Sequence, residues 1–230
     1  MIRQQAILNL VRTVAEALGS DLEKFVFVGG AAVALLIDNP AAGDVRPTDD
    51  VDLVSDVSTY GQYAELTALL RDQHGFQHDM NGPLCRFTVR GVTVDVMPTN
   101  EEVIRFANKW YKHVVAKPIH YALSENITIQ LVAPSVLLCT KLEAFADRGN
   151  NDYYGSHDLE DVITLIDARD SILTECQSAP VEIRGYLSDT FTRLIEHSEF
   201  LDSLEGFLPL GSAARLVRLK EKLVALANLL

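Results

Sequence analysis

Two short apolar runs that carry aspartates constrain the fold of this chain more than any other feature. Residues 50–54 read Asp-Val-Asp-Leu-Val, and residues 92–97 read Val-Thr-Val-Asp-Val-Met. Both runs are rich in β-branched residues and predict strands. Side chains alternate between the two faces of a strand, so Asp50 and Asp52 point the same way. Asp95 lies in the second run, and neighbouring strands would gather all three carboxylates.

Three carboxylates at short range repel one another, and a divalent cation is the usual means of neutralising them. Ligands that are all oxygen suit magnesium, which typically binds one or two carboxylates together with substrate phosphates. Asp50, Asp52 and Asp95 are therefore predicted metal ligands. The alternative is a turn cap at Asp50 and solvated strand positions at Asp52 and Asp95, and the aspartates alone do not decide between the two.

A glycine turn upstream favours the metal interpretation. Residues 24–28 predict a strand that ends in Gly29 and Gly30, and residues 31–36 predict the helix that follows. Glycines at such a turn let the backbone approach a ligand, and a helix N-terminus attracts phosphates. Two adjacent glycines are common in turns. Their combination with a later Thr-x-Asp-x-Asp motif and a third strand aspartate is far more specific.

These motifs resemble the nucleotidyltransferase superfamily related to DNA polymerase β, and most closely its AbiEii/AbiGii toxin family of type IV toxin–antitoxin and abortive-infection systems. The family's Gly-Gly and Arg-x-Thr-x-Asp-x-Asp motifs are similar to Gly29-Gly30 and residues 46–52, and its later motif of lysine and aspartates is similar to residues 141–161. His157 stands where the family usually has another basic residue, and Glu160 is an added acid. The resemblance covers residues 20 to 168 approximately.

The resemblance implies an enzyme that transfers a nucleoside monophosphate from a nucleoside triphosphate to an acceptor. Two magnesium ions, or manganese in their place, would clamp the attacking and leaving oxygens of an in-line displacement. The implied metal ligands are Asp50, Asp52 and Asp95. The implied catalytic residues are these three aspartates together with Lys141 and Asp158. The residues implied in nucleotide binding are Gly29, Gly30, Arg46, Thr48, Lys141 and Arg148.

Some of these residues have a structural alternative. Arg46 could pair with an aspartate of its own motif instead of a phosphate. Lys141 and Arg148 share one helical face and would present a cationic stripe to a triphosphate. Asp158 and Asp161 share a face of the next helix, where they could hold Lys141 or Arg148 by ion pairing or contact the nucleotide.

The acceptor is predicted from an uneven distribution of charge. The formal net charge of −12 argues against a general nucleic-acid surface. Residues 103–124, however, contain no acid and combine cations with aromatic side chains, as a single-stranded RNA end would require. The alternative is a solvated face beside ordinary aromatic packing. The predicted acceptor-binding residues are Arg105, Lys109, Trp110, Lys112 and Lys117.

Three functional interpretations follow. The first is a toxin-like nucleotidyltransferase that acts on RNA, at the 3′ end of a tRNA, with an antitoxin protein as a partner. The second is a nucleotidyltransferase that modifies a small molecule such as an antibiotic. The third is a non-catalytic nucleotide-binding regulator, against which the complete set of three aspartates argues.

The chain is predicted to be a cytoplasmic protein that does not associate with membranes. No apolar stretch approaches the roughly 18 residues that cross a bilayer, and the N-terminus lacks a signal-peptide layout. Cys85, Cys139 and Cys176 are widely spaced and odd in number. That pattern fits core residues in a reducing compartment better than a disulfide framework or a zinc site.

The predicted fold is α+β, with a small mixed-sheet nucleotidyltransferase core over residues 1–115 and a mainly helical region over residues 116–230 that completes the cleft. Arg90-Gly91 predicts a hairpin turn. The predicted helices lie at 2–18, 59–73, 101–110, 134–148, 157–169, 180–197 and 212–229. Besides the strands at 24–28 and 50–55, the predicted strands lie at 84–90, 92–97, 112–122 and 127–132.

Overall fold

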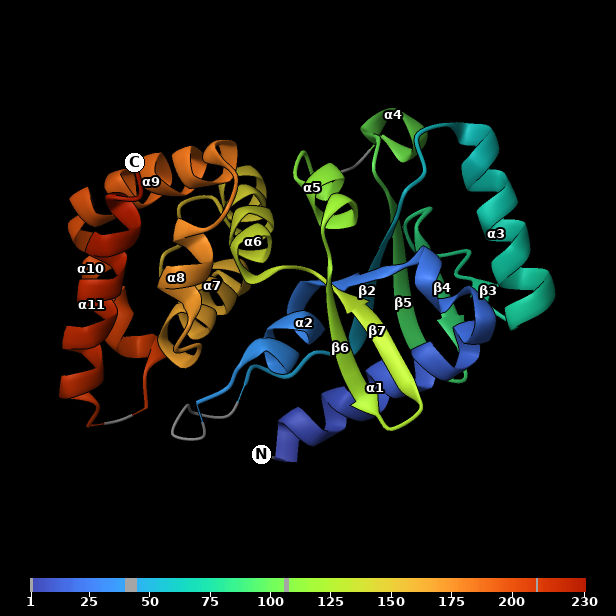
Figure 1. Ribbon diagram of the computed structural model, residues 1–230, viewed down its shortest axis with the longest axis horizontal. Helices are drawn as coiled ribbons and strands as arrows, with labels where there is room; N and C mark the ends of the chain where they lie inside the picture. Colours follow the sequence, from blue (N-terminus) through green and yellow to red (C-terminus); the bar gives the residue numbers. More distant parts are fainter. Residues whose placement is uncertain (1, 40–44, 106–107, 210) are drawn as a thin grey trace. The chain divides into compact units, whose positions relative to one another are not determined.

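The structure is a computed structural model that describes residues 2–39, 45–105, 108–209 and 211–230. The chain forms two compact units. Unit 1 comprises Met1–Leu35 and Pro47–Ala133, and unit 2 comprises Leu36–Arg46 and Pro134–Leu230 (Figure 1). Unit 1 contains the sheet and unit 2 contains the C-terminal helices, so the predicted α+β fold is confirmed. The predicted functional boundary after residue 115 falls inside unit 1 and stays a prediction.

Unit 1 is built on a seven-stranded mixed sheet in the order β3-β4-β5-β2-β1-β7-β6. β2 is parallel to β5 and β1 is parallel to β7, while the other neighbours are antiparallel. The strands are β1 (Val26–Val28), β2 (Asp50–Ser55), β3 (Gln77–His78), β4 (Arg86–Val89), β5 (Val92–Pro98), β6 (Ile119–Ser124) and β7 (Ile127–Leu131).

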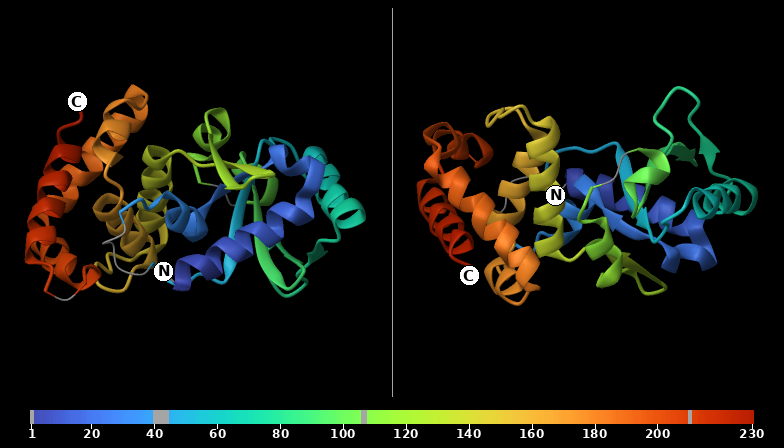
Figure 2. Two further views of the ribbon diagram at one scale, coloured as in Figure 1. Left: turned by 60° about the horizontal axis from the view of Figure 1, so that its bottom comes forward. Right: turned by 90° about the horizontal axis from the view of Figure 1, so that it is seen from above.

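The helices of unit 1 are α1 (Ile2–Leu18), η1 (Gly19–Lys24), α2 (Gly29–Leu36), α3 (Tyr60–His74), α4 (Glu101–Ile104) and α5 (Tyr111–Ala116). Buried apolar residues recur at helical spacing along α1, which contacts β2, β5 and β7 (Figures 1 and 2). α3 begins with a capping box between Thr59 and Gln62 and ends at Gly75, whose φ of 71° is left-handed. These helices cover the sheet and bury its apolar residues.

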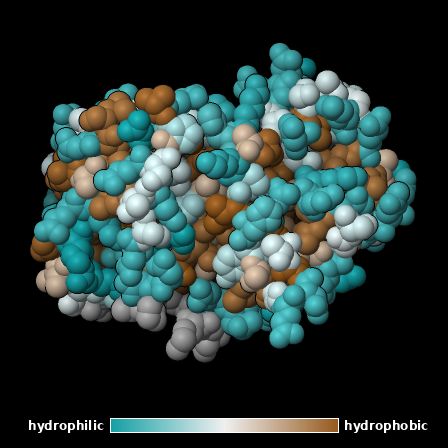
Figure 3. All heavy atoms as spheres, in the orientation of Figure 1, coloured by the Kyte–Doolittle hydropathy of each residue, from teal (hydrophilic) through white to brown (hydrophobic). Residues whose placement is uncertain are grey.

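Unit 2 is helical, with α6 (Pro134–Arg148), α7 (His157–Ala168), α8 (Ile172–Gln177), α9 (Val181–Glu196), α10 (Ser198–Ser203), η2 (Leu204–Phe207) and α11 (Ala213–Ala227). α6 packs against α7, and α9 packs against α11. None of the helices in the described ranges has both the length and the apolar composition needed to cross a membrane. On the face drawn in Figure 3, hydrophobic side chains are interspersed among hydrophilic ones in both units.

Most predicted elements are confirmed, including the hairpin at Arg90-Gly91 that joins β4 to β5. The three cysteines are buried and free, as expected of core residues. The prediction of a strand from residue 112 is wrong in its first part, because residues 111–116 form α5. Trp110, Tyr111 and Val114 are buried there at helical spacing, and this packing outweighs the β propensity of the two adjacent valines. The helix predicted over residues 101–110 ends at Ile104, where Arg105 has a left-handed φ of 58°. The elements β3, α8, α10, η1 and η2 were not predicted.

Candidate functional site

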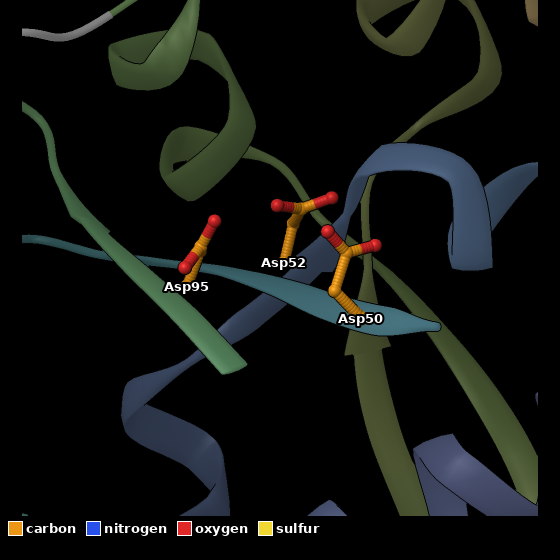
Figure 4. A group of neighbouring side chains, drawn as sticks. All are labelled: Asp50, Asp52 and Asp95. Carbon is orange, nitrogen blue, oxygen red and sulfur yellow. The ribbon is translucent and has the colours of Figure 1, made fainter. Parts of the chain in front are cut away.

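Three aspartates come together on one face of the sheet in unit 1. Asp50 and Asp52 lie on β2 and Asp95 lies on the parallel neighbour β5, where Asp52 and Asp95 occupy the same register position. One ligand oxygen from each carboxylate lies within 4.8 Å of those of the other two. Figure 4 shows all three side chains projecting from the same side of the strands. The predicted gathering of these carboxylates is therefore confirmed.

The alternation of side chains along the two strands explains this arrangement. Val51, Leu53, Val94 and Val96 point to the opposite face, and each is fully buried there. Because this apolar face fixes the register, the aspartates must emerge on the other side. Asp95 is itself buried, with 6 % of its surface exposed. The sheet thus holds these charged groups close together although they repel one another.

Arg86 on β4 is the closest described partner of Asp95. The two residues are direct neighbours across the β4–β5 ladder. Arg86 Nε donates to Asp95 Oδ1 at 2.9 Å, and Nη2 donates to Oδ2 at 2.7 Å. The hydrogen bonds to Asp95 raise the pKa of Arg86 above its usual value, despite partial desolvation. Arg86 therefore fixes the orientation of one carboxylate of the triad.

Arg86 was not predicted from the sequence, although a signal for it was present. A two-residue turn at Arg90-Gly91 sets the register of the hairpin, because the residues on either side of it must pair. Counting outward from that turn places Arg86 opposite Asp95, which is the pairing observed.

Thr48 and Gly29 contact the other two carboxylates. The Thr48 hydroxyl donates to Asp50 Oδ1 at 2.7 Å, so it orients a predicted metal ligand. Gly29 has a φ of +69°, and a Cβ built on it would lie 1.8 Å from Asp52 Oδ2. The glycine turn and Asp52 are therefore in close contact, and only glycine fits there. Phosphate binding by Thr48, Gly29 and Gly30 stays a prediction.

The carboxylate group has the composition of a site for a hard divalent cation. Its donors are all oxygens, as magnesium and manganese prefer. Each carboxylate oxygen carries two lone pairs, so Asp95 can accept from Arg86 and still face a cation. The residues present thus fit the predicted metal.

A second group of aspartates lies in unit 2, between α6, α7 and the segment that contains Arg46. Lys141 Nζ lies 2.6 Å from Asp161 Oδ2 and 3.2 Å from Asp158 Oδ1. Arg148 donates to both oxygens of Asp158, at 2.9 and 3.1 Å, and Arg46 Nη2 lies 3.3 Å from Asp161 Oδ2. We call these five residues the helical ion cluster.

The helical ion cluster is largely buried. The side chains of Lys141, Asp158 and Asp161 are 11 %, 9 % and 5 % exposed, while that of Arg148 is 63 % exposed. Burial pushes the pKa of Asp158 upward, but the hydrogen bond from Arg148 and the charge of Lys141 outweigh it and lower this pKa. Ion pairing, one of the two alternatives for these aspartates, is what the structure shows. The nucleotide-binding roles of Arg46, Lys141 and Arg148 and the catalytic role of Asp158 stay predictions.

The predicted acceptor-binding residues differ in exposure. Arg105, Lys109, Lys112 and Lys117 are exposed, with Lys109 Nζ 5.7 Å from the centre of the Trp110 ring. Trp110 is 4 % exposed and offers little surface for stacking on a base. Residues 106 and 107 of the basic stretch lie outside the described residues. Binding of an acceptor by this stretch stays a prediction.

The chain matches no protein-family model, and a search of curated proteins found no significant match. The resemblance to nucleotidyltransferases therefore stays a prediction from the sequence motifs.

Proposed function

We propose that this protein is a magnesium-dependent nucleotidyltransferase, which moves a nucleoside monophosphate from a nucleoside triphosphate to an acceptor. The observation that carries the proposal is the triad of Asp50, Asp52 and Asp95 on two parallel strands, with ligand oxygens within 4.8 Å of one another. Magnesium held by these residues would neutralise phosphate charge and lower the pKa of the attacking hydroxyl. The reaction itself then needs little other acid–base chemistry.

The residues around the triad have distinct tasks in this proposal. Thr48 keeps Asp50 in place through its hydrogen bond of 2.7 Å, and Arg86 does the same for Asp95 through two hydrogen bonds. Asp95 would accept a hydrogen bond from the acceptor hydroxyl and orient it toward the α-phosphate. Such positioning of two reactants supplies a large part of the rate enhancement in enzymes of this type.

The glycine turn supports a triphosphate beside the triad. Gly29 approaches Asp52 so closely that no other residue fits, and α2 begins at this glycine. The N-terminus of a helix presents free N–H groups and positive dipole charge to an anion. Gly29 and Gly30 would therefore bind phosphate oxygens through the backbone.

RNA, and specifically the 3′ end of a tRNA, is the acceptor in this proposal. The support is the resemblance to the AbiEii/AbiGii toxins and the exposure of four cations in the acid-free stretch, namely Arg105, Lys109, Lys112 and Lys117. Exposed cations would bind the RNA backbone. A toxin of this kind would be restrained by an antitoxin protein.

A labelling experiment tests the proposal. The purified protein is incubated with magnesium, total RNA and each α-labelled nucleoside triphosphate in turn. We expect label on tRNA, no label with Asp52→Asn, and full labelling with Asp49→Asn, which removes an adjacent exposed charge. Label on a small molecule instead of RNA would show that the proposed acceptor is wrong but would support nucleotidyl transfer. If no labelled product forms with any acceptor, the catalytic proposal fails.

A further inference from the structure

A cavity of about 520 Å³ lies within unit 1 at the end of β2 that is remote from Asp50. Ser55, the last residue of β2, lines it three residues beyond Asp52, which is about 10 Å along a strand. The cavity has the volume of many small-molecule sites, which span about 300–1,000 Å³. It is therefore large enough for an organic ligand and separate from the carboxylate triad.

The cavity has an apolar floor. Val26 at the start of β1, Val57 after β2 and Leu66 on α3 are each less than a tenth exposed. Leu69 on α3 and Val115 on α5 complete this lining. A hydrocarbon or aromatic group bound there would remove apolar surface of both the ligand and the protein from water, which favours binding.

The rim of the cavity is acidic. Glu23, Asp56 and Glu65 line it, against the single lysine Lys24. Lys24 is already bound to Asp21, with Nζ 2.7 Å from Oδ1. The charge at the rim therefore opposes phosphates and other anions and attracts a cationic head group.

Ser55 adds a polar group to the lining of the cavity. The residue is 5 % exposed, and its hydroxyl can donate or accept a hydrogen bond. An amine or hydroxyl of a bound molecule would find a hydrogen-bond partner there.

We propose that this cavity binds a small organic cation with an apolar body, at a site distinct from the carboxylate triad. The carboxylates of Asp56 and Glu65 hold the cationic head at the rim, Ser55 offers a hydrogen bond, and the valine and leucine side chains contact the apolar body. This inference does not rest on the proposed nucleotidyltransferase function.

Three probes that share an indole ring test the charge preference. Tryptamine carries a cationic head, tryptophol a neutral one and indole-3-acetate an anionic one. Each is titrated into the full-length protein with isotope-labelled valine and leucine methyl groups. We expect tryptamine to shift the signals of Val57, Leu66, Leu69 and Val115 in a saturable manner, tryptophol to bind several-fold more weakly, and indole-3-acetate not to saturate these shifts.

Substitutions of charged residues test whether tryptamine binds in this cavity. Asp56→Asn combined with Glu65→Gln should weaken tryptamine binding about tenfold, which is the loss expected from about 1.4 kcal/mol of interaction. Glu101→Gln combined with Glu125→Gln removes the same charge from exposed positions outside the cavity and should leave the affinity unchanged. Asp50→Asn combined with Asp52→Asn should also leave the cavity shifts unchanged.

Several results would overturn the proposal. One is equal affinity for all three probes, and another is equal weakening by the cavity pair and by the control pair of substitutions. Loss of the tryptamine shifts in the Asp50 and Asp52 variants would place the binding at the triad instead. An absence of saturable shifts up to on the order of 10 mM tryptamine, a range that covers weak millimolar affinities, would exclude the site.

Discussion

The two groups of aspartates in this protein differ in the net charge that they carry together with their basic partners. In unit 1, Asp50, Asp52 and Asp95 occur with Arg86, so these four side chains together carry a charge of −2. In unit 2, the two aspartates of the helical ion cluster occur with Arg46, Lys141 and Arg148, so these five side chains together carry +1.

The difference is the one expected between a metal-binding site and a structural contact. In the helical ion cluster each carboxylate has two basic partners, so the aspartates are already neutralised and hold helices together. On the sheet, three carboxylates lie within 4.8 Å of one another and Arg86 pairs with Asp95, so a bound cation would offset the remaining repulsion. Substitutions in each group test whether the two groups have these different roles.

The largest expected effect is on activity. Asp50→Asn keeps an acceptor for Thr48 but removes one charge from the triad. Nucleotidyl transfer should fall at least about 10²–10³-fold, the usual loss for a preorganised electrostatic group. The melting temperature should stay constant or rise, because like-charge repulsion decreases. Label incorporation and thermal unfolding measure the two effects. The comparison fails if Asp50→Asn unfolds the protein while activity per folded molecule is retained.

The next largest effect is on stability. Lys141→Met removes the shared partner of Asp158 and Asp161 and should lower the free energy of unfolding by about 3 kcal/mol, near the lower limit for a broken buried ion pair. Asp158 retains Arg148. Urea unfolding measures the loss. Lys24→Met is the matched control, since its half-exposed pair should contribute less than about 1 kcal/mol. Equal losses in the two variants would contradict a structural role for the cluster.

Arg86→Met should connect stability to metal binding. Loss of two charge-assisted hydrogen bonds to Asp95 should cost about 2–3 kcal/mol. Magnesium or manganese should then raise the melting temperature more in the variant than in the unaltered protein, because the cation replaces the lost positive charge. Arg71→Met, which breaks an exposed pair with Asp72, should change neither quantity. An identical metal-induced shift in all three proteins would show that no cation reaches Asp95.

Gly29→Ala tests the close contact with Asp52. Gly19 also has a positive φ, of 52°, but a Cβ on it would meet nothing within 4 Å. Gly19→Ala should therefore cost only the strain of a left-handed backbone, about 1 kcal/mol. Gly29→Ala should cost more, because its Cβ collides with Asp52 Oδ2, and it should also weaken metal binding. Calorimetric unfolding and metal titration of both variants give the comparison, and equal costs would disprove the contact.

The smallest expected effect is a pH dependence. The pKa of Asp158 in the folded protein is lower than its usual value of 3.8. Its ionised form therefore stabilises the folded state above that usual value, and this stability is lost as the pH falls through the folded pKa. As the pH falls below about 5, the free energy of unfolding should decrease more in the unaltered protein than in Asp158→Asn. Parallel acid-dependent slopes in the two proteins would contradict this assignment.

Local patterns predicted the strands and strand faces on which the three aspartates lie. The alternation in residues 50–54 placed two aspartates on one face, and the turn at Arg90-Gly91 fixed the hairpin that carries Asp95. Such short-range patterns survive folding because each is reinforced by the burial of the opposite face of its strand.

Long-range contacts were not predictable in the same way. Arg46 and Asp161 are 115 residues apart, and nothing near Arg46 in the sequence distinguishes that partner from the aspartates of its own motif. The helix at residues 111–116 was missed because its valines favour a strand, whereas the burial of Trp110 and Tyr111 depends on the rest of unit 1. In both places tertiary packing decides the outcome, and local preference does not.

The parallel pairing of β2 with β5 has a consequence for how the carboxylate triad is assembled. Asp52 and Asp95 are neighbours in space, but α3, β3 and β4 lie between them along the chain. Contacts between distant segments form slowly, because loop closure costs entropy before any contact offsets it. A newly synthesised or partly unfolded chain therefore has no assembled triad. The three carboxylates come together only when the central strands of the sheet have paired.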